Sequence, residues 1–308
     1  MTQALSFVAF ALGLTFYGAS TILFFLEIAP HRSPKGSAGP GPQAAPTARS
    51  AADLRPMIQR TMAAAGSASR GTSVAPRLLG VGALSHAAYV TFASFIAHVC
   101  PVHSVHFILS VASLLAIACY LVARLRFKIS ALGLIVSPLG LAFLLGTYFL
   151  GKPGPEPKLS STFIALHVMA NLLGVALFLL AGGAAALYLV QEKRLKQKRP
   201  ASRIATLPPL DILDRAVHRF LVAGFPLLTV GIVTGTFWAH HLEMGTPDEV
   251  MRIVLGYTTW LLVAGVLVLR VAAGWRGRRA AYGTIAGFAC AAAVLVIYLV
   301  RPAAGVGG

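Results

Sequence analysis

Several apolar runs longer than eighteen residues divide this chain, and almost all of its charged residues lie between them. A run of about 20 apolar residues is the length that crosses the hydrocarbon core of a bilayer as an α-helix. Helices suit that core because all of their backbone hydrogen bonds are made within the segment. We therefore expect an all-α fold, a polytopic membrane helical bundle with about eight transmembrane helices. The expected spans are 4–28, 78–99, 104–123, 130–149, 160–190, 212–239, 251–273 and 281–300.

The basic residues raise the question of a nucleic acid partner, since the formal net charge is +17. A nucleic-acid-binding surface needs clustered basic residues on a folded face, with polar and aromatic neighbours. Here 57% of the residues are hydrophobic and only 11% are charged, and the basic ones occupy short segments beside the apolar runs. That pattern is typical of topology signals in membrane proteins. We therefore expect no nucleic acid partner, and contact with membrane lipid instead.

The same basic segments predict the orientation of the chain, because segments rich in Lys and Arg remain on the cytoplasmic side of a membrane. Threading the chain through eight spans places four basic segments on one side: 31–77, 123–128, 191–203 and 270–279. Both termini then lie on the extracytoplasmic side. We expect a multi-pass protein of the cell inner (cytoplasmic) membrane.

Three regions follow one another along the chain. Residues 1–28 read as a first transmembrane helix rather than a signal peptide, because they lack a basic start and an A-x-A cleavage site. Residues 29–77 are rich in Ala, Gly, Ser and Pro and cannot bury enough apolar surface to fold alone. They are predicted to be a disordered cytoplasmic linker, with a surface helix at 51–65 as the alternative. Residues 78–308 hold the remaining spans.

His86 and His167 lie among apolar residues of expected spans, where each needs a polar partner or a ligand. His167 shares a helical face with Asn171, four residues further on. Spacing alone leaves two interpretations of His167: an interhelical hydrogen bond to a backbone or hydroxyl group, or an axial ligand to haem iron. His86 allows the same two interpretations, with Ser85 and Tyr89 as nearby partners.

A second cluster of candidate residues follows the sixth expected span. Trp238 ends that apolar run at the expected outer interface, where an indole ring is favoured. His240 and His241 come directly after it and precede an acidic segment. Each of these histidines is interpreted either as a polar helix end or as a ligand.

No catalytic signature identifies an enzyme. The sequence has no G-x-S-x-G, H-E-x-x-H, P-loop or dinucleotide motif, and its three cysteines form no C-x-x-C pair. Asp211 and Asp214 lie near Arg215 and Arg219 at helical spacing, so we interpret them as cap and ion-pair residues. Whether the protein is an enzyme stays open, and a non-enzymatic role is favoured.

Three segments resemble the cytochrome c assembly family of membrane proteins, which includes the CcsA haem-handling subunit and HemX-like relatives. They are FIALHVMANLLGVALFLLAGGAAALYLVQEKRLK, LPPLDILDRAVHRFLVAGFPLLTVGIVTGTFWA and GWRGRRAAYGTIAGF, within a resemblance that covers about residues 78–300. The resemblance implies a helical bundle that presents non-covalently bound haem at the outer membrane face. By position in the motifs, His167 matches a haem-ligating histidine and Trp238 matches the tryptophan that opens the family's outer loop.

Two functions are therefore expected as alternatives. In the first, the protein is a haem-handling factor with His167 and His240 as iron ligands, and with Trp238, His241 and His86 as further haem-binding residues. Its partners would be haem, another cytochrome c assembly subunit and apocytochrome c. In the second, it is a HemX-like regulator or scaffold of tetrapyrrole synthesis that binds no haem. The segment WAHHLEMGTPDEV favours this alternative because it lacks the further tryptophans of CcsA-type members.

Overall fold

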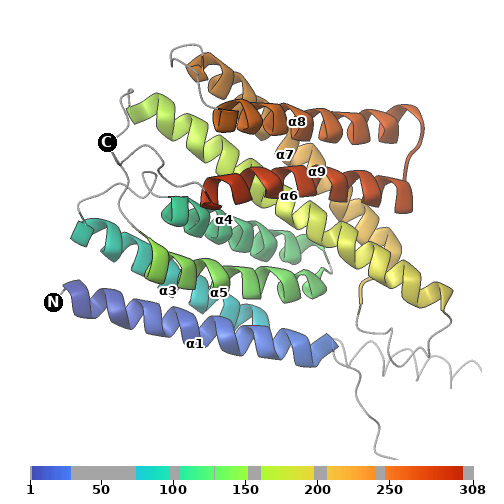
Figure 1. Cartoon of the computed structure of the whole chain (residues 1–308). Helices are drawn as coiled ribbons and strands as arrows, with labels where there is room; N and C mark the ends of the chain where they lie inside the picture. Colours follow the sequence, from blue (N-terminus) through green and yellow to red (C-terminus); the bar gives the residue numbers. More distant parts are fainter. Residues whose placement is uncertain are drawn as a thin grey trace, which may run out of the picture.

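A computed structural model of the chain has an all-α architecture. It describes residues 2–28, 74–97, 105–127, 129–151, 161–197, 207–239 and 247–300. Within these ranges eight α-helices lie side by side, and no strand is present (Figure 1). The helices are α1 (Thr2–Ile28), α3 (Ala75–Ala97), α4 (Val105–Arg126), α5 (Gly133–Leu150), α6 (Ser161–Lys196), α7 (Leu210–Ala239), α8 (Pro247–Ala272) and α9 (Arg278–Val300).

The length and composition of these helices confirm the predicted fold class. Seven of them, α1 and α3 to α8, are long and apolar enough to cross a membrane. The eighth expected span, 281–300, lies within α9. The two longest helices, α6 and α7, have 36 and 30 residues. At about 1.5 Å per residue, α6 is roughly 54 Å long, against about 30 Å of hydrocarbon.

Helix α6 is the centre of the bundle, with α4 on one side and α7 and α9 on others (Figure 1). In its apolar window 56% of the residues are buried, compared with 22% for α7 or α8. Small residues in the middle of α6 allow this close approach. A Cβ atom at Gly182 would lie 3.0 Å from Phe288 of α9, and one at Gly183 would lie 3.2 Å from Ile135 of α5.

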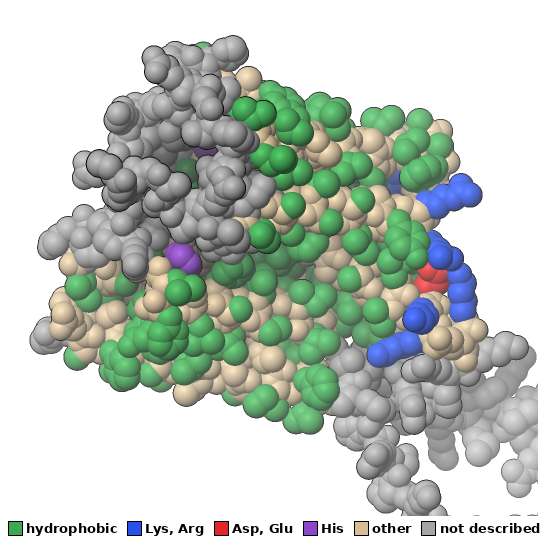
Figure 2. Space-filling view, viewed as in Figure 1, with side chains coloured by type: hydrophobic (Ala, Val, Ile, Leu, Met, Phe, Trp, Pro, Cys, Tyr) green, Lys and Arg blue, Asp and Glu red, His purple; other side chains and the backbone are tan. Residues whose placement is uncertain are grey.

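Successive helices alternate in direction, so the bundle has two chemically different ends (Figure 1). The Lys and Arg side chains that the structure describes gather at one end, hereafter the charged end (Figure 2). It is formed by the last turns of α1, α4, α6 and α8 and the first turns of α3, α5, α7 and α9. By the bounds of the helices, the basic residues near this end are Arg77, Arg124, Arg126, Lys193, Arg194, Lys196, Arg215, Arg219, Arg270, Arg276, Arg278 and Arg279.

The described parts of the four predicted basic segments all lie at the charged end. Eight spans that alternate in direction were predicted to place these segments on one side. The cytoplasmic assignment of this end, and the extracytoplasmic position of both termini, stay predictions. Most of the predicted linker 29–77 lies outside the described residues.

Candidate functional site

His167 lies between α6 and α7, towards the end of the bundle opposite the charged end. It is half-buried, and its Nδ1 atom is 2.8 Å from the hydroxyl oxygen of Thr234 on α7. Asn171 lies one turn further along α6, and its amide nitrogen donates to the backbone carbonyl of His167 at 3.0 Å. The interhelical hydroxyl contact named in one of the two interpretations of His167 is present, and Asn171 lies on the same face. The interpretation of His167 as an iron ligand stays a prediction.

A notch in α7 makes room for these two side chains. Gly231 and Gly235 are four residues apart and therefore lie on one face of α7. A Cβ atom at Gly235 would lie 3.1 Å from Cε1 of the His167 ring, and one at Gly231 would overlap the side-chain amide of Asn171. Small residues at this spacing let two helix backbones approach closely in a membrane. Here the two glycines leave room for the side chains of His167 and Asn171 of α6.

The hydroxyl of Thr234 is either donor or acceptor towards the ring, depending on the tautomer of His167. Its oxygen also lies 2.6 Å from the carbonyl oxygen of Val230. The side-chain amide nitrogen of Asn171 lies 3.1 Å from Nε2 of the ring. A neutral imidazole with one ring nitrogen held by a hydrogen bond is suited to bind a metal through the other.

The other residues predicted near this end fall at the limit of the described chain. Trp238 is in the last turn of α7, one turn beyond Thr234, so the structure brings the end of α7 and His167 to the same interface. Its side chain, together with His240 and His241, lies outside the described residues. The roles assigned to Trp238, His240 and His241 therefore stay predictions.

His86 lies apart from His167, in the half of the bundle formed by α1, α3, α4 and α5. It is fully buried, and both of its ring nitrogens have partners on other helices. Nδ1 is 3.2 Å from the hydroxyl of Tyr17 on α1, and Nε2 is 2.9 Å from the hydroxyl of Ser110 on α4. The neighbours suggested by sequence, Ser85 and Tyr89, are not its partners in the hydrogen bonds of the described residues.

The His86 hydrogen bonds continue through two more hydroxyl groups. Ser110 lies 2.5 Å from the hydroxyl of Thr147 on α5, which donates to a backbone carbonyl, that of His106, at 2.9 Å. Both ring nitrogens of His86 and the hydroxyls of Tyr17, Ser110 and Thr147 thus have hydrogen-bond partners among the described residues. This geometry favours the structural interpretation of His86.

Replacing His86 by leucine is expected to lower the free energy of unfolding by about 1–2 kcal/mol. The substitution removes the ring that hydrogen-bonds to the buried hydroxyls of Tyr17 and Ser110. Thermal unfolding of the detergent-purified protein measures this loss. Thr91→Val is a suitable control, because the exposed Thr91 hydroxyl bonds only to the preceding turn of its own helix. Equal stability of the two variants would contradict a structural role for His86.

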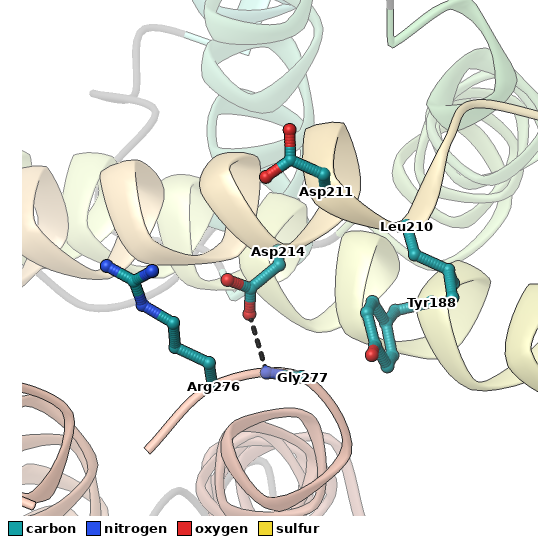
Figure 3. Close-up of a pocket in the computed structure, with 6 residues that line it drawn as sticks. All are labelled: Tyr188, Leu210, Asp211, Asp214, Arg276 and Gly277. Carbon is teal, nitrogen blue, oxygen red and sulfur yellow. Dashed lines mark hydrogen bonds between the residues drawn. The ribbon is translucent and has the colours of Figure 1, made fainter. Parts of the chain in front are cut away.

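A pocket of about 300 Å³ opens at the charged end, between the start of α7 and the turn that joins α8 to α9 (Figure 3). Its lining residues are Tyr188, Leu210, Asp211, Asp214, Arg276 and Gly277. The Asp214 carboxylate points towards the backbone N–H of Gly277, which donates to it at 3.0 Å (Figure 3). Gly277 has a φ of 63°, a conformation that favours glycine, and a Cβ atom there would lie 2.6 Å from the Tyr188 hydroxyl.

Both carboxylates in this pocket are engaged by protein groups. Asp211 pairs with Arg215 at 2.5 Å within α7, which confirms its predicted ion pair. Asp214 pairs with Arg270 of α8 at 2.5 Å. We refer to Asp214, Arg270 and Gly277 as the clasp, because they join the start of α7 to α8 and to the turn before α9. The clasp is a structural element rather than a reaction centre.

Three residues of the His167 site were not identified from the sequence: Thr234, Gly231 and Gly235. The glycine spacing G-I-V-T-G is visible in the sequence and could have indicated a close helix contact. Which helix fills the notch, and which hydroxyl meets His167, depends on the packing register of α6 and α7.

Residues 78–303 match the family described as cytochrome C assembly protein. Among curated relatives, the cytochrome c biogenesis protein CcsA of Guillardia theta is 31% identical over 184 residues, covering 51% of this chain and 59% of the relative. The protein of the same name from Heterosigma akashiwo (strain NIES-293) is 29% identical over 217 residues, covering 55% and 66%. The chain thus spans less than two thirds of the length of these relatives. No solved structure matches significantly.

Proposed function

Because this chain belongs to the cytochrome c assembly protein family, we propose that it is an integral membrane haem-handling protein of cytochrome c assembly. Haem is its cargo, held without covalent attachment at the end of the bundle opposite the charged end. The observation that carries this proposal is His167, whose ring lies between two helices with Nδ1 2.8 Å from the hydroxyl of Thr234. The protein acts in the cell inner membrane, with another assembly subunit and apocytochrome c as partners.

The residues of the site fit haem in three respects. An axial ligand to haem iron must be a neutral imidazole, which the hydrogen bond to Thr234 supports. His167 is half-buried rather than enclosed, so a large planar group can approach it. Phe237, an exposed aromatic residue near the end of α7, supplies apolar surface of the kind that contacts a porphyrin. In this proposal Trp238 flanks the ring, and His240 or His241 provides the second axial ligand.

Replacing His167 by alanine is expected to abolish most haem retention in the detergent-purified protein, because it removes the iron ligand that the fold positions. The measurement is the absorption spectrum of oxidised and reduced protein, with a pyridine haemochrome assay for the haem-to-chain ratio. Added imidazole is expected to restore part of the spectrum of the His167→Gly variant by occupying the vacated ligand position.

His218→Ala is the matched control, since His218 is a half-buried histidine of α7 near the charged end. It is expected to retain haem as the unmodified protein does. Thermal unfolding of each variant separates a lost ligand from a lost fold. Equal haem retention in the His167 and His218 variants would overturn the assigned role of His167.

The alternative is a HemX-like regulator or scaffold that acts on tetrapyrrole synthesis through the charged end. The basic side chains exposed there, including Arg276, Arg278 and Arg279, favour an acidic partner. The same purification distinguishes the two functions. A protein that is colourless and also fails to bind added haem supports the regulator.

A further inference from the structure

We propose that Thr234 is the positioning residue for His167, and that it holds the imidazole in the Nδ1–H tautomer so that Nε2 is the nitrogen presented to a ligand. The Nδ1–H tautomer is inferred from the hydrogen-bond geometry. That Nε2 binds haem iron rests on the proposed function.

The Thr234 hydroxyl has one proton and several acceptors within reach. Its oxygen is 2.6 Å from the carbonyl oxygen of Val230 and 3.2 Å from that of Gly231, both in the preceding turn of α7. With the proton donated to either carbonyl, the hydroxyl oxygen accepts at the 2.8 Å contact with His167, and Nδ1 then carries the ring proton.

Asn171 is another polar side chain beside the ring. Its amide nitrogen lies 3.1 Å from Nε2 and 3.4 Å from Nδ1, and it also donates to the backbone carbonyl of His167. A donor placed nearly equally far from both ring nitrogens does not distinguish them. The contact of Thr234, in contrast, is with Nδ1.

The Thr234 hydroxyl is held rigidly. Thr234 is β-branched, its hydroxyl is tied to its own helix, and Gly235 beside it approaches the Cε1 edge of the ring. The hydroxyl, the notch and the ring thus form one fixed arrangement between α6 and α7. A hydrogen bond from the second nitrogen of a ligating histidine both orients the ring and raises its basicity as a ligand.

The test replaces Thr234 by valine, which keeps the shape and removes the acceptor, and by serine, which keeps the hydroxyl. The first readout is nitrogen-15 NMR of histidine-labelled protein without haem, with His167→Gln used to assign the His167 signals. Unmodified protein and Thr234→Ser are expected to show a protonated Nδ1. Thr234→Val is expected to lose that preference and populate the Nε2–H form.

The second readout is the affinity for added haem, measured by titration of the Soret absorption. Loss of the hydrogen-bond partner of a ligating histidine typically weakens metal binding by about 10–100-fold. Thr234→Val is expected to fall in that range, and Thr234→Ser is expected to recover most of the affinity. Thermal unfolding of both variants separates a lost hydrogen bond from disturbed packing.

Thr229→Val is the matched control. Thr229 lies on the same helix, bonds to its own backbone at Phe225, and accepts from the ring N–H of Trp260 on α8 at 3.0 Å. Its replacement removes an equivalent interhelical acceptor away from His167. Neither the His167 tautomer nor the haem affinity is expected to change in this variant.

The outcomes separate this inference from the proposed function. An unchanged Nδ1–H tautomer in Thr234→Val would overturn the inference, whatever haem does. If Thr234→Val alters the tautomer but the unmodified protein binds no haem, the positioning role stands and the haem-handling function fails. A tautomer change that accompanies weaker haem binding, with recovery by serine, supports both.

Discussion

Replacing Asp214 by alanine is expected to lower the free energy of unfolding by about 3–5 kcal/mol, because removing one partner of a buried ion pair leaves the other charge buried and uncompensated. The side chain of Arg270 is only 6% exposed, and that of Asp214 is 15% exposed. The substitution also removes the acceptor for the backbone N–H of Gly277. The unfolding midpoint of the detergent-purified protein, followed by circular dichroism against temperature or denaturant, measures the loss.

Asp211→Ala provides a matched control one turn away on the same helix. The pair of Asp211 and Arg215 has the same 2.5 Å separation, but its side chains are 71% and 59% exposed. Exposed pairs contribute about 0–1 kcal/mol, so this variant is expected to unfold close to the unmodified protein. Replacing Asp214 and Arg270 together by leucine is expected to recover much of the stability, since no unpaired charge then remains. Equal losses at Asp211 and Asp214 would contradict the clasp.

The second large effect is expected at the notch. Replacing Gly231 by valine is expected to cost about 3 kcal/mol, because overpacked side chains force neighbouring groups out of place. Its Cβ atom would lie 2.6 Å from Cγ of Asn171, well inside van der Waals contact, and the valine methyl groups add further bulk. Either Asn171 leaves His167 or α6 and α7 move apart. The same unfolding measurement reports the cost.

Gly265→Val on α8 is the control for this substitution, because a Cβ atom at that position meets nothing within 4 Å. It is expected to change stability little. Asn171→Ala combined with Gly231→Val removes the group that the valine displaces, so the double variant is expected to be more stable than the sum of the single effects predicts. Strict additivity of the two substitutions would indicate that Asn171 and Gly231 do not meet.

The sequence predicted the helices well because the length of an apolar run depends only on local composition. The span expected at 130–149 is the 3₁₀ turn Ser130–Leu132 followed by α5 up to Leu150. Family membership, expected from three motif segments, is confirmed by a match over residues 78–303. These features need no knowledge of how one helix packs on another.

Partners across helices were predicted less well, since they depend on the packing register. Helical spacing correctly paired Asp211 with Arg215, but Asp214 reaches Arg270, 56 residues away, instead of Arg219 on its own helix. For His86, Tyr17 is 69 residues away in sequence. His167 was correctly expected to meet a hydroxyl or backbone group, yet its particular partner, Thr234, is set by the position of the notch. Local patterns indicate which face is polar, and tertiary packing chooses the partner.

The clasp also has a consequence for the order in which the protein is made. The start of α7 leaves the ribosome well before Arg270, which follows Asp214 by 56 residues. Until α8 has entered the membrane and the chain has turned back at Gly277, the Asp214 carboxylate has no partner from the clasp. N-terminal segments are made first during synthesis, so α7 precedes its clasp partners. Arrival of the hairpin of α8 and α9 is thus the event that closes the clasp.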